Sequence, residues 1–129
     1  MVIDTSALVA ILGDEPERRA FNEAIEAADS RLMSAASFVE ASIVIEARYG
    51  AAGLRDLDLF VDRSAISMVA FDAAQAHIAR HAFSRFGKGR HPAALNFGDC
   101  FAYALARVLG ESLLFKGKDF SQTDVPSAL

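Results

Sequence analysis

The chain has 129 residues, 53% of them hydrophobic and 23% charged, with a formal net charge of −4 at pH 7. This length predicts a single domain over residues 1–129, and the apolar content excludes an intrinsically disordered chain. The negative charge argues against a simple basic nucleic-acid-binding protein, and no apolar run is long enough to span a membrane. The lone cysteine, Cys100, allows no internal disulfide, so we expect a cytoplasmic protein.

The first residues predict a buried strand that turns directly into a helix. Val2 and Ile3 are β-branched and apolar, and Asp4 ends the run. Thr5 and Ser6 can cap the helix that follows. The end of such a strand faces the crevice at the carboxyl edge of a parallel sheet, where α/β folds bind ligands. Asp4 alone leaves two interpretations open, a helix cap or a ligand-binding carboxylate.

Strand and helix patterns alternate along the rest of the chain. Helices are predicted over about 17–28, 37–49, 54–65, 72–86 and 97–109. Short strands are predicted over 31–34, 66–71 and 113–115, with a candidate fifth strand in 117–125. This order predicts a three-layer α/β/α fold around a mostly parallel sheet of four to five strands. The helix that Gly50 should stop is apolar on more than one face, which indicates deep burial or contact with another subunit.

Two acids occupy the first turns of predicted helices. Glu40 ends Ser37-Phe38-Val39-Glu40, which matches a capping box, and Asp99 follows Asn96, which can cap its helix. Each acid therefore has an ordinary structural explanation. Both turns nevertheless lie near the sheet edge where Asp4 is expected.

Asp119 and Asp124 follow the last predicted strand. A loop Asp is commonly a turn residue. Asp119, however, comes four residues after the strand residue Phe115, so like Asp4 it is expected close to the carboxyl end of a strand. Acids that gather at one edge of a sheet provide the oxygen ligands that Mg²⁺ or Mn²⁺ prefers. A bound cation would also reverse the local negative field.

Other reactive residues give weaker signals. His77 and His81 share a helix face, but no H-E-x-x-H pattern surrounds them, so we interpret them as surface or dimer-contact residues. Cys100 has no cationic neighbour in sequence and is interpreted as a packed side chain rather than a nucleophile.

Four segments in order resemble one family over nearly the whole chain. They are VIDTSALVA (2–10), SFVEASIVIEARYG (37–50), NFGDCFAYALA (96–106) and LLFKGKDFSQTDV (113–125). These segments resemble the PIN-domain ribonucleases and, more narrowly, the VapC toxins of bacterial type II toxin–antitoxin pairs. The resemblance implies a metal-dependent endoribonuclease that forms a homodimer. It also implies that a small VapB-like antitoxin, encoded alongside, neutralises the protein.

The resemblance also suggests roles for individual residues. The acids that match Asp4, Glu40, Asp99 and Asp119 surround the metal in that family. We expect Asp4 and Asp99 to bind it directly, and Glu40 and Asp119 to act through water. Asp124 is a candidate extra acid.

The hydroxyl matching Thr5 or Ser6 assists the substrate or the water at the metal. Phosphate contacts are expected from Lys88, Arg90 and His91 in the loop GKGRHP, and from Lys116 and Lys118. An ordinary solvated loop explains the same charges equally well.

Two other functions remain open on the sequence. A receiver-type signalling module would use Asp72 as phospho-acceptor and Lys116 as its partner, but it leaves Glu40 and Asp99 without a role. A catalytically silent PIN-like protein would bind a partner or RNA without cleaving it. The retained acids argue against that alternative.

Overall fold

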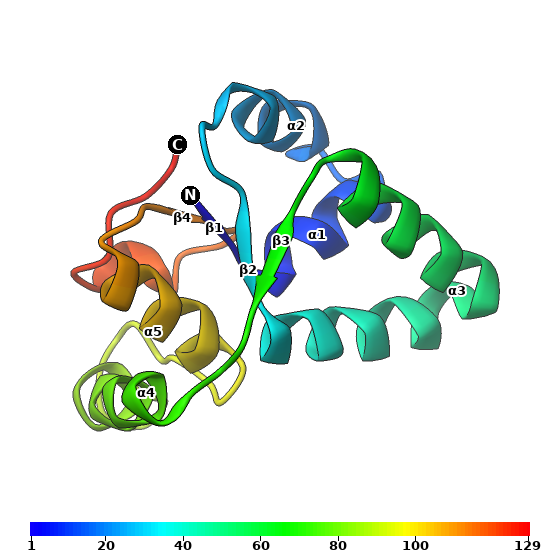
Figure 1. Cartoon of the computed structure of the whole chain (residues 1–129). Helices are drawn as coiled ribbons and strands as arrows, with labels where there is room; N and C mark the ends of the chain where they lie inside the picture. Colours follow the sequence, from blue (N-terminus) through cyan, green and yellow to red (C-terminus); the bar gives the residue numbers. More distant parts are fainter.

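A four-stranded sheet runs through the centre of the computed structural model, which describes residues 1–129 (Figure 1). The strand order is β3-β2-β1-β4, and every neighbouring pair is parallel. The strands are β1 (Val2–Ile3), β2 (Leu32–Ser34), β3 (Ser67–Val69) and β4 (Leu113–Leu114). Because the strands are parallel, all their carboxyl ends lie at one edge of the sheet.

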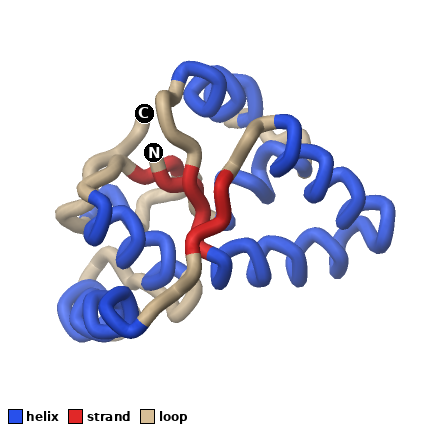
Figure 2. The backbone as a smooth tube through the Cα atoms, viewed as in Figure 1, coloured by secondary structure: helices blue, strands red, loops and turns tan.

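Helices cover both faces of this sheet, and Figure 2 shows the strands running between them. On one side lie α1 (Thr5–Leu12), α2 (Arg18–Ala27) and α3 (Ala35–Arg63). On the other lie α4 (Ala73–Phe86) and α5 (Asp99–Leu109). The expected three-layer α/β/α fold is therefore confirmed. No helix is both long and apolar enough to cross a bilayer.

Alternate strand residues supply the two halves of the core. Ile3 and Leu114 pack with α1 and α3, whereas Val2 and Leu113 pack with α5. All four side chains are at most 1% exposed. Neighbouring residues of a strand point to opposite faces, so such short strands can anchor both helical layers only if every residue is apolar.

Gly50 divides α3 into two helical halves, as its position in the sequence predicts. Its φ of 67° and ψ of −157° lie in a region that glycine alone adopts readily. The chain turns back there, and the two halves of α3 form the hairpin visible in Figure 1. The turn lets both Ile45 and Leu57, which are fully buried, reach the core around α1.

The strand predicted over 66–71 is present as the shorter β3, Ser67–Val69, at one edge of the sheet. Two other expectations about local structure are wrong. The candidate fifth strand over 117–125 contains the short 3-10 helix η1 (Phe120–Gln122) instead. Ser34, not Ser37, caps α3, its Oγ accepting a hydrogen bond from the Ala36 N–H at 3.3 Å, so Ser37 and Glu40 form no capping box.

Candidate active site

The predicted acids are carried by four elements that meet at the carboxyl edge of the sheet. Asp4 follows β1, Glu40 lies in the second turn of α3 after β2, and Asp99 begins α5. Asp119 follows β4 and directly precedes η1. The parallel sheet brings these elements to one place although up to 115 residues separate the acids in sequence.

Asp4 caps a helix and also presents a free oxygen. Its Oδ2 accepts hydrogen bonds from the Ser6 N–H (3.0 Å) and the Ser6 hydroxyl (2.6 Å), so Asp4 itself, rather than Thr5 or Ser6, is the N-cap of α1. Its Oδ1 is buried and has no hydrogen-bond partner. Both interpretations of Asp4 are therefore compatible, because each uses a different oxygen. A buried oxygen without a donor is the kind of group that a cation stabilises.

The two neighbouring hydroxyls support the position of Asp4. The Ser6 hydroxyl accepts a hydrogen bond from the Lys116 N–H (3.0 Å), which links Asp4 to the end of β4. The Thr5 hydroxyl donates to the Ser37 carbonyl (3.0 Å) and links α1 to α3. Thr5 is buried, whereas Ser6 is partly exposed and directly contacts Asp4. Of the two hydroxyls, Ser6 is the one placed at the acids.

Asp99 is held by reciprocal hydrogen bonds at the start of α5. The Asp99 N–H donates to Asn96 Oδ1, and the Asn96 N–H donates to Asp99 Oδ2, both at 2.9 Å. The expected cap by Asn96 is thus present. As with Asp4, only one carboxylate oxygen is engaged, and the other remains free to bind a ligand.

Glu40 reaches the start of α5 because residue 98 has no side chain. A Cβ placed on Gly98 would overlap the Glu40 carboxylate. Gly98 was not among the predicted site residues. A glycine between a helix cap and a first-turn acid nevertheless indicates that another part of the chain approaches the backbone closely there. Gly98 thereby allows Glu40 to lie next to Asp99.

Burial and mutual repulsion change the acidity of the two central carboxyls. Burial raises the pKa of Asp4 to about 6, an increase that the Ser6 hydrogen bonds limit and the charge of Glu40 enlarges. Burial likewise raises the pKa of Asp99 to about 7 against the hydrogen bond from Asn96. The charges of Asp4, Asp119 and Glu40 make smaller contributions to the same increase in the Asp99 pKa. These four carboxylates are therefore within electrostatic reach of one another.

The four acids lie around the site, but their carboxylates are too far apart to share one metal ion in this arrangement. No group of three Asp, Glu, His or Cys side chains is close enough as placed to hold a metal ion. Asp119 is exposed and makes no side-chain cap to η1. Carboxylates that repel one another stay apart until a cation offsets their charge. The unpartnered Asp4 oxygen and an all-carboxylate donor set fit a hard divalent cation such as Mg²⁺ or Mn²⁺.

Asp124, the candidate extra acid, belongs to a separate network. It accepts a hydrogen bond from the Tyr103 hydroxyl at 2.6 Å, and Arg85 and Arg107 lie 3.4 Å and 3.8 Å away. Burial raises the pKa of Asp124, but the Tyr103 hydrogen bond and the two guanidinium groups outweigh it and lower the pKa overall. The structure thus uses Asp124 to join the C-terminal segment to α4 and α5.

The predicted phosphate-binding residues differ in how accessible they are. The amino group of Lys116 is paired with Glu15 and lies 3.5 Å from Glu17. Lys88 is exposed, and the Arg90 guanidinium lies 6.0 Å from the centre of the Phe83 ring. Lys88 and Arg90 are therefore better placed than Lys116 to meet a ligand.

The remaining candidates in these loops have structural or surface positions. His91 Nδ1 accepts a hydrogen bond from the Ala93 N–H (3.0 Å) and so braces its own loop. Lys118 is exposed beside Asp119. Cys100 is buried, as expected, and burial together with the charge of Asp99 raises the pKa of its thiol to about 11.

The sheet order argues against the receiver-type alternative. Asp72 follows β3 and Lys116 follows β4, which are the two opposite edge strands. The Asp72 side chain caps α4 by accepting from the Gln75 N–H at 2.9 Å. A phospho-acceptor and its lysine would have to meet, whereas this fold keeps these two residues apart.

Comparison with known proteins identifies relatives of the whole chain. The family model described as "PIN domain" matches residues 1–126. Ribonuclease VapC30 of Mycobacterium tuberculosis is 57% identical over 125 residues, which cover 97% of this chain and 95% of the relative. Ribonuclease VapC of Mycolicibacterium smegmatis is also 57% identical, with 97% of both chains covered.

Solved structures with this fold include a toxin and a toxin–antitoxin complex. VapC20 of Mycobacterium tuberculosis, described as a Sarcin-Ricin loop cleaving toxin, aligns with a TM-score of 0.78 at 15% identity and covers 96% of this chain and 95% of its own. A toxin–antitoxin complex from Klebsiella pneumoniae aligns with a TM-score of 0.71 at 15% identity, covering 95% and 92%. At such low identity these two likenesses concern the fold.

Asp99→Asn should stabilise the protein in the absence of divalent cations. The change keeps the acceptor for the Asn96 N–H and removes a charge that burial and three acids disfavour. At about pH 8 we expect the free energy of unfolding to rise by about 1–3 kcal/mol, since one pKa unit corresponds to about 1.4 kcal/mol and Asp99 stays partly solvated. Denaturant unfolding with and without the substitution measures this difference.

The stabilisation by Asp99→Asn should depend on pH. The pKa of Asp99 in the folded protein, about 7, lies above its ordinary value of 3.8, so the charged group destabilises the fold above pH 7. The advantage of Asn should be full above about pH 7, shrink as the pH falls, and vanish below the unfolded-state pKa of 3.8, where both states of the wild type are protonated. Asp56→Asn, at an exposed position of α3, is the control. Equal stability of Asp99→Asn and wild type at pH 8 would contradict the prediction.

Proposed function

Since the chain belongs to the PIN-domain family and to its VapC members, we propose that it is the ribonuclease toxin of a toxin–antitoxin pair. The proposed reaction is metal-dependent hydrolysis of RNA phosphodiester bonds by the acids at the sheet edge. Such a toxin would act on RNA in the cytoplasm. We further propose that the protein forms a homodimer and that a small antitoxin inhibits it.

The observation that carries the metal-dependent mechanism is the state of Asp4. Its carboxylate is 3% exposed, one oxygen is fully used by Ser6, and the other has no partner. Such an arrangement is unfavourable for an isolated protein. It is favourable where a cation binds the free oxygen.

The other acids complete the proposed site. Asp4 and Asp99 each keep one free oxygen and are assigned as direct ligands, whereas Glu40 and Asp119 act through water or orient the attacking water. A bound Mg²⁺ or Mn²⁺ would lower the pKa of water and offset negative charge on the phosphate. Ser6 holds Asp4 in the orientation that leaves Oδ1 directed away from the helix cap.

Removal of metal or of Glu40 should abolish RNA cleavage. We expect the purified chain to cleave RNA with Mg²⁺ or Mn²⁺, and chelation by EDTA to stop cleavage. Glu40→Gln should lower the rate by about 100-fold or more, because it removes a charge that positions water or metal. Glu46→Gln, at an exposed position on the same helix, is the matched control. Cleavage that persists in EDTA, or a wild-type rate for Glu40→Gln, would refute metal-dependent catalysis by these acids.

The loop that carries Lys88 and Arg90 should bind RNA phosphates. Replacing both by Ala should weaken RNA binding and reduce the slope of log affinity against log salt by roughly 1.4, about 0.7 for each lost contact to a single strand. Arg48 and Arg55, exposed on α3, supply a control pair of equal charge. Binding is measured over a salt series in an Asp99→Asn background that does not cleave. An unchanged slope would leave the loop as an ordinary connection.

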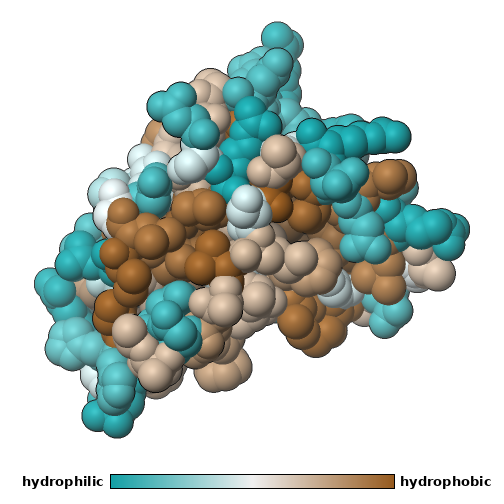
Figure 3. Space-filling model, viewed as in Figure 1, coloured by the Kyte–Doolittle hydropathy of each residue, from teal (hydrophilic) through white to brown (hydrophobic).

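Exposed apolar side chains support the proposed protein contacts. Val39 and Ile43 on α3 are 56% and 64% exposed, and Val108 and Leu109 end α5 at 43% and 46%. Figure 3 shows hydrophobic residues gathered over α5 and along the first half of α3. Ile43 follows Glu40 by three residues and therefore lies on the same side of α3, so a partner on this face would also lie near the acids. An antitoxin with an apolar helix and a cation directed at the acids fits this surface.

The gene next to this one should encode a small protein that copurifies with the chain. The complex should survive high salt, because its contacts are mainly apolar. Val39→Asp combined with Ile43→Asp should weaken binding at least tenfold, as expected for central apolar contacts. Leu129→Asp, at the exposed C-terminal end, is the control. Failure of the neighbouring protein to bind would argue against the toxin–antitoxin assignment and leave the ribonuclease proposal to be tested by cleavage.

A further inference from the structure

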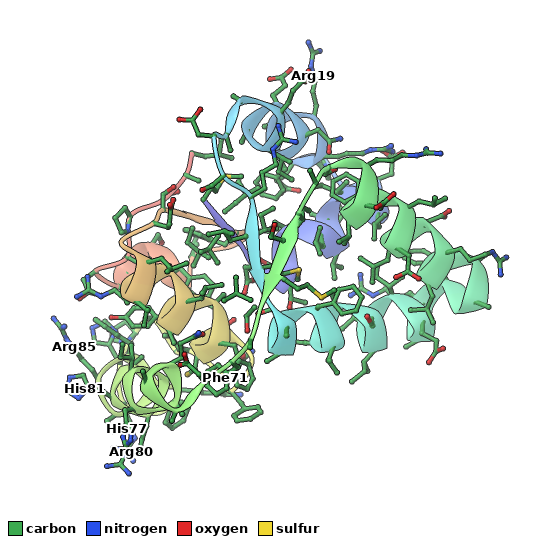
Figure 4. All side chains as sticks on the ribbon, viewed as in Figure 1. Arg19, Phe71, His77, Arg80, His81 and Arg85 are labelled. Atoms are coloured by element: carbon green, nitrogen blue, oxygen red, sulfur yellow. The ribbon has the colours of Figure 1, made fainter.

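One segment of this acidic protein carries cations without any acid. Residues 73–98 contain no Asp or Glu, although the whole chain has 17 of them and a net charge of −4. The segment contains Arg80, Arg85, Lys88 and Arg90, together with all three His residues of the chain. Figure 4 shows His77, Arg80, His81 and Arg85 projecting outward from α4. The segment ends at Gly98, directly before the proposed metal ligand Asp99.

Phe97 is an exposed aromatic residue at the end of this basic segment. It is 79% exposed, more than any other large hydrophobic residue of the chain. Phe97 lies between Asn96 and Asp99, whose reciprocal hydrogen bonds hold the intervening backbone. The next residue, Gly98, contacts the Glu40 carboxylate. The backbone of Phe97 is therefore held in place two residues before Asp99.

Other aromatic rings keep Phe97 in position. Its ring meets that of Phe101 edge to face, with centroids 4.8 Å apart. Phe101 meets Phe71 in the same way at 4.7 Å. In an edge-to-face pair, a ring face can remain available for stacking with a ligand. The contacts also restrict rotation of the Phe97 side chain, so a ligand loses less affinity in ordering it.

These rings line an open cleft between α4 and α5. The cleft has a volume of about 430 Å³, and its walls include Phe71, Phe83, Phe97 and Phe101. Arg80 lines the same cleft, and the Arg90 guanidinium lies over the Phe83 ring at 6.0 Å. Aromatic faces bordered by arginines are the combination with which proteins bind unpaired nucleotides.

On the basis of the ribonuclease function proposed above, we propose that Phe97 stacks on an unpaired base of the RNA, next to the bond that the acids cleave. The cations of α4 and of the 87–92 loop would hold neighbouring phosphates. Because the chain is acidic overall, long-range attraction cannot supply much of the affinity for RNA. Stacking is a short-range contribution that does not depend on net charge.

This proposal identifies the substrate as single-stranded RNA or an extruded nucleotide. A base inside a duplex has both faces covered by its neighbours and cannot stack on Phe97. Stacking tolerates every base, so Phe97 would set the position of the strand rather than its sequence. The adjacent phosphate would then lie near Asp99, which is two residues further along the protein chain.

Substitutions at Phe97 separate stacking from a general apolar contact. Phe97→Leu keeps an apolar side chain of similar size but removes the aromatic face, whereas Phe97→Trp keeps a larger aromatic face. Both are made in the non-cleaving Asp99→Asn background. The probe is a fluorescent single-stranded RNA of about 12 nucleotides, within the range that one single-strand binding site covers. Leu59→Ala, at an exposed position in the second half of α3, is the control.

We expect Phe97→Leu to reduce RNA affinity roughly 5- to 100-fold, the range found when a stacking side chain is removed. Phe97→Trp should bind as tightly as the parent or more tightly. The salt slope should stay unchanged in both, because no phosphate contact is lost. A fully paired RNA of the same length should bind equally weakly to all variants.

Parental affinity for Phe97→Leu would refute the stacking role, and so would an equal loss for Phe97→Leu and Phe97→Trp. If Phe97→Leu changes only the sedimentation of the free protein, then Phe97 contacts a protein surface and the proposal fails. The ribonuclease function is tested separately by cleavage in Mg²⁺ or Mn²⁺. If wild-type protein cleaves RNA while Phe97→Leu binds and cleaves normally, the function stands and the stacking proposal falls.

Discussion

A buried carboxylate at the end of the first strand places the strongest constraint on this structure. Asp4 must accept hydrogen bonds from Ser6 to start α1, and Ser6 must in turn meet the end of β4 through the Lys116 N–H. The position of the acid therefore depends on correct pairing of β1 with β4. One interaction thus joins helix initiation, sheet register and the geometry of the proposed site.

The acidic site lowers the stability of the protein that contains it. Four carboxylates come within reach of one another, and burial disfavours the charge on Asp4 and Asp99. A fold selected only for stability would replace at least one of them. The divalent cation proposed for this site would bind the folded protein and thereby offset that cost. Gly98 is required by the packing at the start of α5, because any larger residue there would displace the carboxylate of Glu40.

Charge and apolar surface are divided among the faces of the molecule. The four candidate acids lie at the sheet edge, α4 and its following loop carry cations without any acid, and exposed apolar residues lie on α3 and α5. In the proposed function this division would let an acidic protein bind RNA, because attraction would be local and the bound metal would offset repulsion. The same fold in toxins only 15% identical in sequence indicates that few residues are needed to maintain it.

The sequence by itself determined the layer architecture, the parallel sheet and the family. Apolar periodicity and the order of strands and helices carry that information locally, and four motifs in order carry the resemblance. Gly50 as a helix break and Asn96 as a cap were predictable for the same reason, since each acts on residues within one turn. Asp4, Glu40, Asp99 and Asp119 were also identifiable as candidate acids.

Only the tertiary structure decided how these acids are used. Which residue caps each helix depended on where the strands end, so Ser34 replaced Ser37 and Asp4 took the place expected of Thr5 or Ser6. Asp124 and Lys116 bind partners that are 21 and 101 residues away, and the sequence contains no local sign of either contact. The contact of Gly98 with Glu40 and the exposure of Phe97 likewise arise where separate elements meet. Long-range packing therefore settled the details of the site, because a local pattern cannot specify which distant side chain will occupy the adjacent space.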